Sequence, residues 1–493
     1  MNNINLIFYF FLATYLTFSL TGCMPEDEIV KETGFELAFS TDTLRFDTVF
    51  TQLGSATRIL KVYNRQDERI RISNIEIEGD FSQKFRMNVD GIPGNRVEDV
   101  EIPANDSIYI FCEVEIDPDE DVSASPFVIE SQIRFETDDR EQRVLLEAWG
   151  QNANYVPSRF GKGTLNLLNG DAIWDDPKPY VIYGWLFVDN GTLTIPAGTR
   201  IYIHGGLVRN EELGVYNDGR LWILENGRLD VQGTAENPVI IEGDRLEEAF
   251  EEEANQWRGI FFASGSRGNR MSYATIRNSS WSIYVDSAAT FVAEQSQFYN
   301  TGTSSIIGEH ATITMDNCLI YNNGGNSFQV IHGGDYELNH CTVASYGVDA
   351  SALALSNFIC YVPASLGCEL GGAYRLNARF RNSIFSGSKN NEVIFVDVIE
   401  NGKDGFDYTF ENCIVKVDED FLEENPDFYE NCLNCPQDIT RDTPLFMDVN
   451  EDDYTLDSLS VAIDAGVFLD NVPVDLEGKR RDQSPDIGCF EKL

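Results

Sequence analysis

The fold is decided by four short segments: Ala274-Thr-Ile-Arg-Asn278, Ser296-Gln-Phe-Tyr-Asn300, Cys318-Leu-Ile-Tyr-Asn322 and Cys341-Thr-Val-Ala-Ser345. Each segment opens with a small residue, and the opening residues are separated by 22, 22 and 23 positions. β-branched strand segments that recur near this interval match one turn of a parallel β-helix, whereas helical solenoids need about 33 or more residues per repeat. The central region is therefore predicted to be a parallel β-helix.

The same alignment places polar side chains above one another at the ends of the strands. One column holds Asn278, Asn300 and Asn322, and a second holds Asn317, His340, Asn382 and Asn412. Amides stacked at about 4.8 Å can hydrogen-bond along the axis, and Asn tolerates the tight turn between two sheets. We interpret these asparagines as a structural ladder; use of them in an active site is the alternative.

The column of small residues continues beyond the four segments. Ser383 and Cys413 keep its register after gaps of 42 and 30 residues, which predicts an extra coil or an inserted loop. Cys318, Cys341 and Cys413 are expected to point inward as free thiols, because parallel rungs hold their Cβ vectors alike, which is poor disulfide geometry.

Two other cysteine pairs are close in sequence, Cys360 with Cys368 and Cys432 with Cys435. In an exported protein such pairs are candidate disulfides. Cys432 and Cys435 are also half of a zinc motif, but no second such pair or nearby His completes it.

Earlier coils carry a second signature, formed by Gly227-Arg-Leu-Asp-Val-Gln-Gly-Thr234, Asn237-Pro-Val-Ile-Ile241 and Gln256-Trp-Arg-Gly-Ile-Phe261. Gly and Pro mark corners while alternating apolar residues point inward. The run resembles bacterial surface β-helix proteins of the pectate-lyase-like superfamily, over about residues 166–415. The resemblance implies a right-handed parallel β-helix across residues 153–437 and is much less specific for activity.

Three motifs stand near the end of the sequence: Val461-Ala-Ile-Asp-Ala-Gly466, Asp475-Leu-Glu-Gly-Lys-Arg480 and Pro485-Asp-Ile-Gly-Cys-Phe-Glu491. They resemble the choice-of-anchor Q ending of exported β-helix proteins, with Val461 in place of Pro and Cys489 in place of Ala. Because an open last coil invites stacking with another chain, residues 438–493 are expected to form a C-terminal cap. Asp464 and Arg480 or Arg481 are the expected internal partners. A metal or ligand site on Asp464, Asp486 and Glu491 is the alternative.

Residues 35–152 show about seven short alternating strands, which indicate a β-sandwich. The clearest is Ser107-Ile-Tyr-Ile-Phe-Cys-Glu-Val-Glu-Ile116, in which Cys112 shares the apolar face with the aliphatic residues. Together with Leu60-Lys-Val-Tyr-Asn64 and Val114-Glu-Ile-Asp-Pro118, this region resembles immunoglobulin-like domains of the ASPM/SPD-2/Hydin and MSP type. The resemblance implies a spacer or docking module.

The first 22 residues read as a lipoprotein signal peptide. An apolar run at residues 6–20, too short for a membrane span, leads to Leu20-Thr-Gly-Cys23, which resembles a lipobox. Cys23 is the expected lipidation site, and the lipid would anchor the protein in the outer membrane. Residues 23–34 form an acidic tether, which favours exposure at the cell surface. A simple secretory signal with an incidental Cys is the alternative.

The chain carries 81 acidic and 36 basic residues, a net charge of −45. This charge excludes nucleic acid as a partner. No cofactor is predicted; Ca²⁺ is a plausible counter-ion, but the composition locates no metal site.

No catalytic set converges in the sequence. Residues 179–388 contain no Lys, and the nearest carboxylates, Asp286 and Asp316, fall in different registers with no identified partner one coil away. The candidate glycan contacts are Trp222, Trp257, Trp281 and Tyr284, with core or corner packing as the alternative. The leading hypothesis is a non-catalytic cell-envelope lipoprotein whose β-helix binds a polysaccharide or another envelope protein. The alternative is a polysaccharide lyase or glycoside hydrolase.

Overall fold

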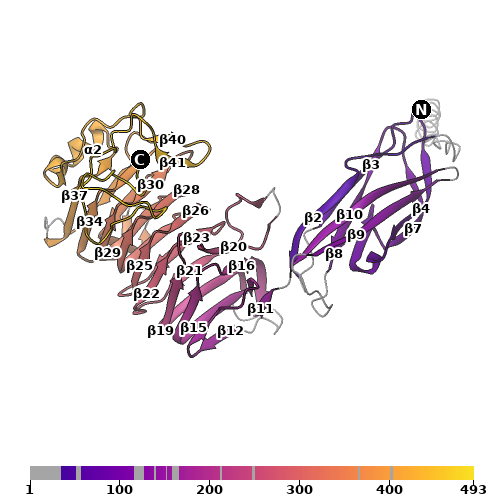
Figure 1. The fold of residues 1–493 in the computed structure, drawn as a ribbon, viewed down its shortest axis with the longest axis horizontal. Coiled ribbons are helices and arrows are strands. Elements are labelled where there is room, and N and C mark those ends of the chain that lie inside the picture. The colour runs from indigo at the N-terminus through magenta and orange to yellow at the C-terminus, as the bar shows by residue number, and fades with distance from the viewer. Residues whose placement is uncertain are drawn as a thin grey trace, which may run out of the picture. The chain divides into compact units, whose positions relative to one another are not determined.

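The computed structural model describes residues 35–50, 57–115, 127–137, 140–151, 153–157, 166–210, 214–246, 250–364, 367–399 and 404–492. The fold is nearly all β, and the chain divides into two compact units, residues 1–152 and 153–493 (Figure 1). Within the described ranges, no helix has the length and apolar character needed to cross a membrane. The signal peptide and Cys23 lie outside the described residues, so lipidation stays a prediction.

The first unit is a β-sandwich of two five-stranded sheets (Figure 1). One sheet has the order β1 (Ala38–Phe39), β3 (Arg58–Tyr63), β8 (Ser107–Val114), β5 (Phe85–Val89), β6 (Ile92–Pro93). The other has the order β2 (Thr43–Phe50), β10 (Glu141–Gln151), β9 (Phe127–Glu136), β4 (Ile70–Glu78), β7 (Arg96–Ile102). Strand β8 alternates as predicted: Ile108, Ile110, Cys112 and Val114 are buried while Tyr109 and Phe111 are exposed.

The second unit is a right-handed parallel β-helix built from two long sheets (Figure 1). The ten-stranded sheet, here wall 1, consists of β11 (Asn154–Pro157), β14 (Tyr180–Tyr183), β16 (Arg200–His204), β20 (Val239–Gly243), β23 (Ala274–Arg277), β26 (Gln297–Thr301), β28 (Leu319–Asn323), β30 (Thr342–Ser345), β35 (Ile384–Gly387) and β38 (Ile414–Val415).

The fifteen-stranded sheet bends along its length and supplies two further walls. Wall 2 consists of β12 (Asn166–Asn169), β21 (Gly259–Phe262), β24 (Ile283–Val285), β31 (Leu353–Ser356), β36 (Val393–Val396) and the first halves of β15 (Trp185–Pro196), β19 (Arg220–Gln232), β27 (Ile306–Asp316) and β29 (Phe328–Asn339). Wall 3 consists of β13 (Ala172–Ile173), β22 (Asn269–Ser272), β25 (Thr290–Glu294), β34 (Leu376–Arg381), β37 (Phe406–Glu411), β39 (Cys432–Leu433) and the second halves of the same four long strands.

The strand registers confirm the predicted stack. Thr275 pairs with Gln297, Gln297 with Leu319, and Leu319 with Thr342, so Ala274, Ser296, Cys318 and Cys341, each one residue earlier, lie above one another. All of these pairings are parallel. The interior column beside them is apolar and runs through Ile201, Ile241, Ile276, Phe298, Ile320, Val343, Phe385 and Val415.

The 42-residue gap holds an inserted hairpin and no extra coil. Strand β30 pairs directly with β35, and the additional residues form β32 (Phe358–Ala364) and β33 (Gly367–Ala373). Cys360 and Cys368 form a disulfide in this hairpin, and Cys432 and Cys435 form a second one, as the sequence predicts. Cys318, Cys341 and Cys413 are free and buried, also as predicted.

Residues 438–493 were expected to cap the last coil, and this position was wrong. The last coil is covered by helix α2 (Glu419–Glu424) and the 3-10 helix η5 (Phe428–Glu430), whose Phe421 and Phe428 pack on each other and on Phe395. Residues 438–492, here the C-terminal strap, lie instead along the outer face of wall 1. The strap includes the hairpin of β40 (Phe446–Asp448) and β41 (Asp453–Leu456).

The strap lies there because the outer face of wall 1 is apolar over its last four strands. Ile384 and Ile414 point outward there and cluster with Ile439, Leu456 and Ile487 of the strap. Burying this face removes apolar surface from water at about 25 cal/mol per Å². The strap therefore completes the hydrophobic packing of wall 1.

Candidate functional site

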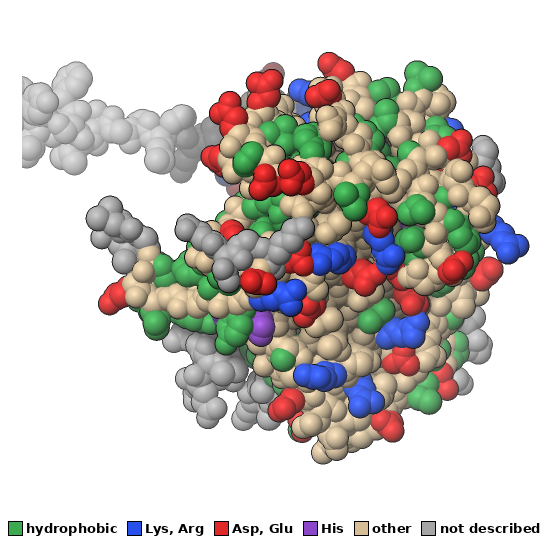
Figure 2. Space-filling model, turned by 90° about the vertical axis from the view of Figure 1, so that its left-hand side faces the viewer, with side chains coloured by type: hydrophobic (Ala, Val, Ile, Leu, Met, Phe, Trp, Pro, Cys, Tyr) green, Lys and Arg blue, Asp and Glu red, His purple; other side chains and the backbone are tan. Residues whose placement is uncertain are grey.

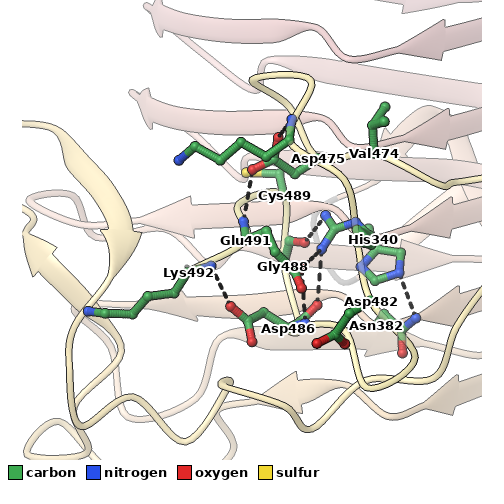
Figure 3. Close-up of polar contacts among 12 residues, drawn as sticks. His340, Asn382, Val474, Asp475, Asp482, Asp486, Gly488, Cys489, Glu491 and Lys492 are labelled. Atoms are coloured by element: carbon green, nitrogen blue, oxygen red, sulfur yellow. Dashed lines mark hydrogen bonds and ion pairs between the residues drawn. The ribbon is translucent and has the colours of Figure 1, made fainter.

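Three carboxylates of the strap accept hydrogen bonds from within the strap. Asp475, Asp486 and Glu491 lie close together in Figure 3, and each accepts at least two of these bonds. Asp475 accepts three backbone N–H bonds of 2.8–2.9 Å, and Asp486 accepts N–H bonds from Asp464 at 2.8 Å and Lys492 at 2.6 Å. The side chain of Asp464 is exposed and contributes only its backbone. Over the described ranges, no group of acidic, His and Cys side chains has the arrangement of a metal site.

Arg481, and not Arg480, is the internal basic partner. Its side chain is fully buried and pairs with Glu491 at 2.7 Å. It also donates to the Asn317 Oδ1 atom at 2.8 Å and to the Gly488 carbonyl at 2.9 Å. This network holds the strap against the β-helix, so we assign it a structural role.

The asparagine columns occupy the two corners that flank wall 1. Asn278, Asn300 and Asn322 have φ of 52–64°, and Asn317, His340, Asn382 and Asn412 have φ of 49–51°. This left-handed region suits Asn among residues that carry a Cβ.

The amides of these columns take different partners. Asn322 donates to Asn300 at 2.6 Å, and Asn382 bonds His340 at 2.8 Å, both along the axis. Asn278 instead donates to the carbonyls of Glu251 and Glu253. Asn317 and Asn412 donate to carbonyls of the strap, those of Val474 and Ala465 respectively. The columns are thus a partial ladder, interrupted where loops or the strap lie over it.

Asp316 has a carboxylate neighbour one coil away, contrary to the expectation from sequence. Glu294 pairs with Asp316 in register on the outer face of wall 3, where Asn339 donates to Asp316 at 2.7 Å. Burial, with Glu294 nearby, raises the pKa of Asp316 to about 6. Glu294 receives two bonds from Arg270, at 2.8 and 2.9 Å. This pair was not predicted from the sequence, because the repeat was aligned only along the strands of wall 1 and the pair lies on wall 3.

Trp257 cannot contact a glycan. Its side chain is fully buried in the core, and its indole Nε1 donates to the Arg277 carbonyl at 2.9 Å. It belongs to the corner between wall 1 and wall 2, where its side chain points inward. Trp222, Trp281 and Tyr284 lie on the outer face of wall 2 and are half-buried.

Four aromatic rings form a column on this outer face. Phe187, Trp222, Phe261 and Tyr284 pair in register across four successive coils. Their ring centroids are 5.4, 4.8 and 4.9 Å apart in turn. A local pattern encodes the column, because each ring follows an inward aliphatic residue: Leu186, Leu221, Ile260 and Ile283.

Two arginines and two further indoles flank this column. The Arg220 guanidinium lies 5.0 Å from the ring centroids of Trp185 and Trp222 and 5.5 Å from that of Trp281. Arg258 lies 4.2 Å from Trp281. These cation–π distances bring together residues from four successive coils. We call the set the aromatic–arginine patch: Trp185, Phe187, Arg220, Trp222, Arg258, Phe261, Trp281 and Tyr284.

Gly259 makes room for the patch. An added Cβ would lie 2.1 Å from the Trp281 carbonyl oxygen and 2.7 Å from its indole Nε1, and the φ of Gly259 is +134°. Trp281 therefore lies directly against the glycine backbone. The Gly of the Gln256-Trp-Arg-Gly-Ile-Phe261 segment is needed for this contact.

The electrostatics of the patch are unusual for an acidic chain. Burial and the neighbouring Arg258 lower the pKa of Arg220 to about 10, and burial lowers the pKa of Arg258. Among the described residues, no carboxylate lies within ion-pair distance of either guanidinium. The patch thus combines an aromatic surface with two cations that have no acidic partner.

No protein-family model and no curated protein matches the chain. Similar solved structures include the catalytic unit of a thermostable GH87 alpha-1,3-glucanase from Streptomyces thermodiastaticus, at 10% identity, 73% of this chain, 80% of that chain and a TM-score of 0.24. A family 123 glycoside hydrolase from Clostridium perfringens matches at 6% identity, 38% of this chain, 48% of that chain and a TM-score of 0.18. A Porphyromonas gingivalis protein of unknown function matches at 11% identity, 28% of this chain, 59% of that chain and a TM-score of 0.16. The chain thus spans about half the length of the last two, and at these TM-scores the likenesses carry no argument about activity.

Proposed function

We propose that the chain is a cell-envelope lipoprotein whose β-helix binds carbohydrate at the aromatic–arginine patch. In this proposal Cys23 carries the lipid that anchors the protein in the outer membrane, at the cell surface. The first unit is an immunoglobulin-like spacer between the lipid and the β-helix, and the strap carries the choice-of-anchor Q type motifs.

The aromatic column carries the binding proposal. Aromatic rings on the outer face of a sheet, one per coil and continuous over four coils, present a continuous apolar surface against which a sugar chain can pack. Indoles that serve only the core would be buried, as Trp257 is. Trp222, Trp281 and Tyr284 are instead half-buried.

A binding experiment with one variant and one control tests this function. We expect the full-length chain to bind at least one member of a panel of neutral and acidic oligosaccharides, with and without Ca²⁺, and Trp222→Ala to weaken that binding about tenfold or more. Tyr361→Ala removes an aromatic ring of the hairpin that is 54% exposed, and should leave binding unchanged. Equal loss in both variants, or no loss in Trp222→Ala with its melting temperature preserved, contradicts the proposal.

Hydrolysis or lyase chemistry is the second candidate, and Asp316 is the observation that favours it. A carboxyl with a pKa near 6 next to an arginine-bound carboxylate has the division of roles that a general acid and its partner need. The same panel, assayed for reducing ends and for new double bonds, tests this activity. Turnover that is lost in Asp316→Asn would favour catalysis on wall 3 over binding alone on wall 2.

The lipid anchor has its own test. Labelling with a radioactive fatty acid in the expressing cell should mark the wild-type chain and not Cys23→Ala. A labelled Cys23→Ala protein would show that the acyl group is elsewhere.

A further inference from the structure

The two arginines of the patch differ from four arginines of the β-helix that have acidic partners. Arg270 pairs with Glu294, Arg277 with Glu242, Arg379 with Asp407 and Arg381 with Glu337, at 2.5–2.8 Å. On the face drawn in Figure 2, basic and acidic side chains are likewise interspersed. Arg200, Arg228 and Arg267 also have no ion pair within the described part of the chain, but they are exposed. Arg220 and Arg258 therefore stand out as half-buried guanidiniums without an acidic partner among the described residues.

Four N–H donors of the patch are also without hydrogen-bond partners among the described residues. The Nε atoms of Arg220 and Arg258 and the Nε1 atoms of Trp222 and Trp281 are shielded from solvent, and none donates a hydrogen bond. A shielded donor without an acceptor costs free energy, and donors on a cation cost more. Four such donors occur together around Arg220, so this part of the patch has two cations and no acceptor from the described residues, and an incoming anion would offset their charge.

We infer that Arg220 and Arg258 form an anion site within the patch, and that the sugar stacked on its rings is acidic. The ligand class is a carboxylate- or sulfate-bearing oligosaccharide, with the anionic group at the two guanidiniums and the sugar ring on Trp222 and Trp281. This inference rests on the proposed function and names its substrate class.

The chemistry of the patch selects this class. Guanidinium donors match planar carboxylate and tetrahedral sulfate oxygens, and both groups occur on acidic sugars. The indoles add a flat apolar surface, which a free inorganic anion would not use. A long polyanion is disfavoured by the net charge of −45, so a ligand that places one or two charges at the patch is the better fit.

The experiment compares matched probes by calorimetry on the full-length chain. Oligogalacturonate carries carboxylates, and its fully methyl-esterified form has the same backbone without them. Sulfated and unsulfated dextran oligosaccharides repeat the comparison for sulfate, and sodium sulfate alone tests the free anion. We expect one acidic probe to bind about ten- to a hundredfold more tightly than its neutral counterpart, with an affinity that falls as salt rises.

Variants locate the preference. Arg220→Gln with Arg258→Gln should lower affinity for the acidic probe about ten- to a hundredfold and leave the neutral probe within about twofold. Arg258→Lys keeps the charge and should retain part of the preference. Arg228→Gln is the control, since it removes one exposed arginine from the same strand β19 on wall 3 and should change nothing. Thermal melts establish that each variant is folded.

The outcomes distinguish failure of the anion site from failure of carbohydrate binding. If acidic and neutral probes bind equally and Trp222→Ala loses both, carbohydrate binding stands and the anion site is wrong. If the acidic preference persists in the double variant, the anion is recognised elsewhere and the inference is again wrong. If sodium sulfate binds as tightly as the sulfated sugar, the site takes a free anion. If no probe binds, both proposals fall.

Discussion

Arg481 in the strap and Arg220 in the patch are both removed from most solvent, yet their surroundings are opposite. Arg481 has Glu491, the Asn317 amide oxygen and backbone carbonyls around its guanidinium. Arg220 has three indoles, a second arginine and no acid among the described residues. Arginine thus closes a structural network on wall 1, whereas on wall 2 it has no acidic partner among the described residues.

Removing Arg481 should have the largest effect on stability. Arg481→Met leaves the Glu491 carboxylate buried without its partner, and breaking a buried pair in this way costs about 3–5 kcal/mol. Urea unfolding measures the loss. Arg480→Met removes the adjacent, exposed arginine and should stay within about 0.5 kcal/mol of wild type. Similar losses in the two variants would mean that the Arg481 network does not hold the strap on wall 1.

Two buried carboxylates differ in the same way. Glu491 pairs with Arg481, whereas Glu392 has no arginine partner among the described residues. It is fully buried and accepts backbone N–H bonds from Ala352 at 2.9 Å and Lys389 at 2.7 Å. Burial raises the pKa of Glu392 to about 7, so between about pH 4.5 and 7 the folded state holds a proton that the unfolded chain releases.

The stability that Glu392 contributes is therefore greatest in acid, and it falls as pH rises through this window by about 3 kcal/mol. The difference in unfolding free energy between wild type and Glu392→Gln should change by about that amount between pH 4.5 and pH 7. Parallel curves for the two proteins would show that the carboxyl ionises normally.

Gly259→Ala tests whether the patch depends on close packing of Trp281 on the backbone. The added Cβ meets the Trp281 carbonyl oxygen, and the φ of +134° is strained for Ala, so we expect a loss of about 1–3 kcal/mol in urea unfolding. Gly347→Ala has positive φ but open space, and should lose about 1 kcal/mol from strain alone. An equal cost at both sites would contradict the packing assigned to Trp281.

Arg258→Gln should have the smallest effect, and of the opposite sign to that of Arg481→Met. Burial lowers the pKa of both patch arginines, which means that their charged forms are less favourable in the folded state than in the unfolded chain. Removing one charge should leave the free energy of unfolding unchanged or raise it by up to about 1 kcal/mol. A loss above about 1 kcal/mol would indicate that Arg258 has a structural partner after all.

The β-helix could be predicted from sequence because its contacts repeat at a short interval. The column of small residues from Ala274 to Cys341 depends only on contacts between one coil and the next. The same is true of the asparagines with left-handed backbone conformation. The position of the strap could not be predicted in the same way. Arg481 meets Asn317 across 164 residues, and no local pattern records that contact.

The aromatic–arginine patch could be predicted from the sequence only in part. Its rings follow a local rule, one aromatic after each inward aliphatic residue, and Trp222 and Tyr284 were identified as candidate contacts from sequence. The arginines were missed because Arg220 and Arg258 are 38 positions apart, with an insertion between them, so their approach depends on a register that the wall 1 repeat does not give. Trp257 was misplaced because its side chain turns inward at a corner, where alternation no longer holds.

The most direct measurement of the central claim is a ¹H–¹⁵N NMR titration of the indole and guanidinium N–H signals with oligogalacturonate and with sulfated dextran oligosaccharide. The account predicts saturable shifts for Trp222, Trp281, Arg220 and Arg258, and none for the buried Trp257 and Arg481. Shifts confined to other residues, such as Arg270 on wall 3, or no shifts with either acidic probe, would contradict it.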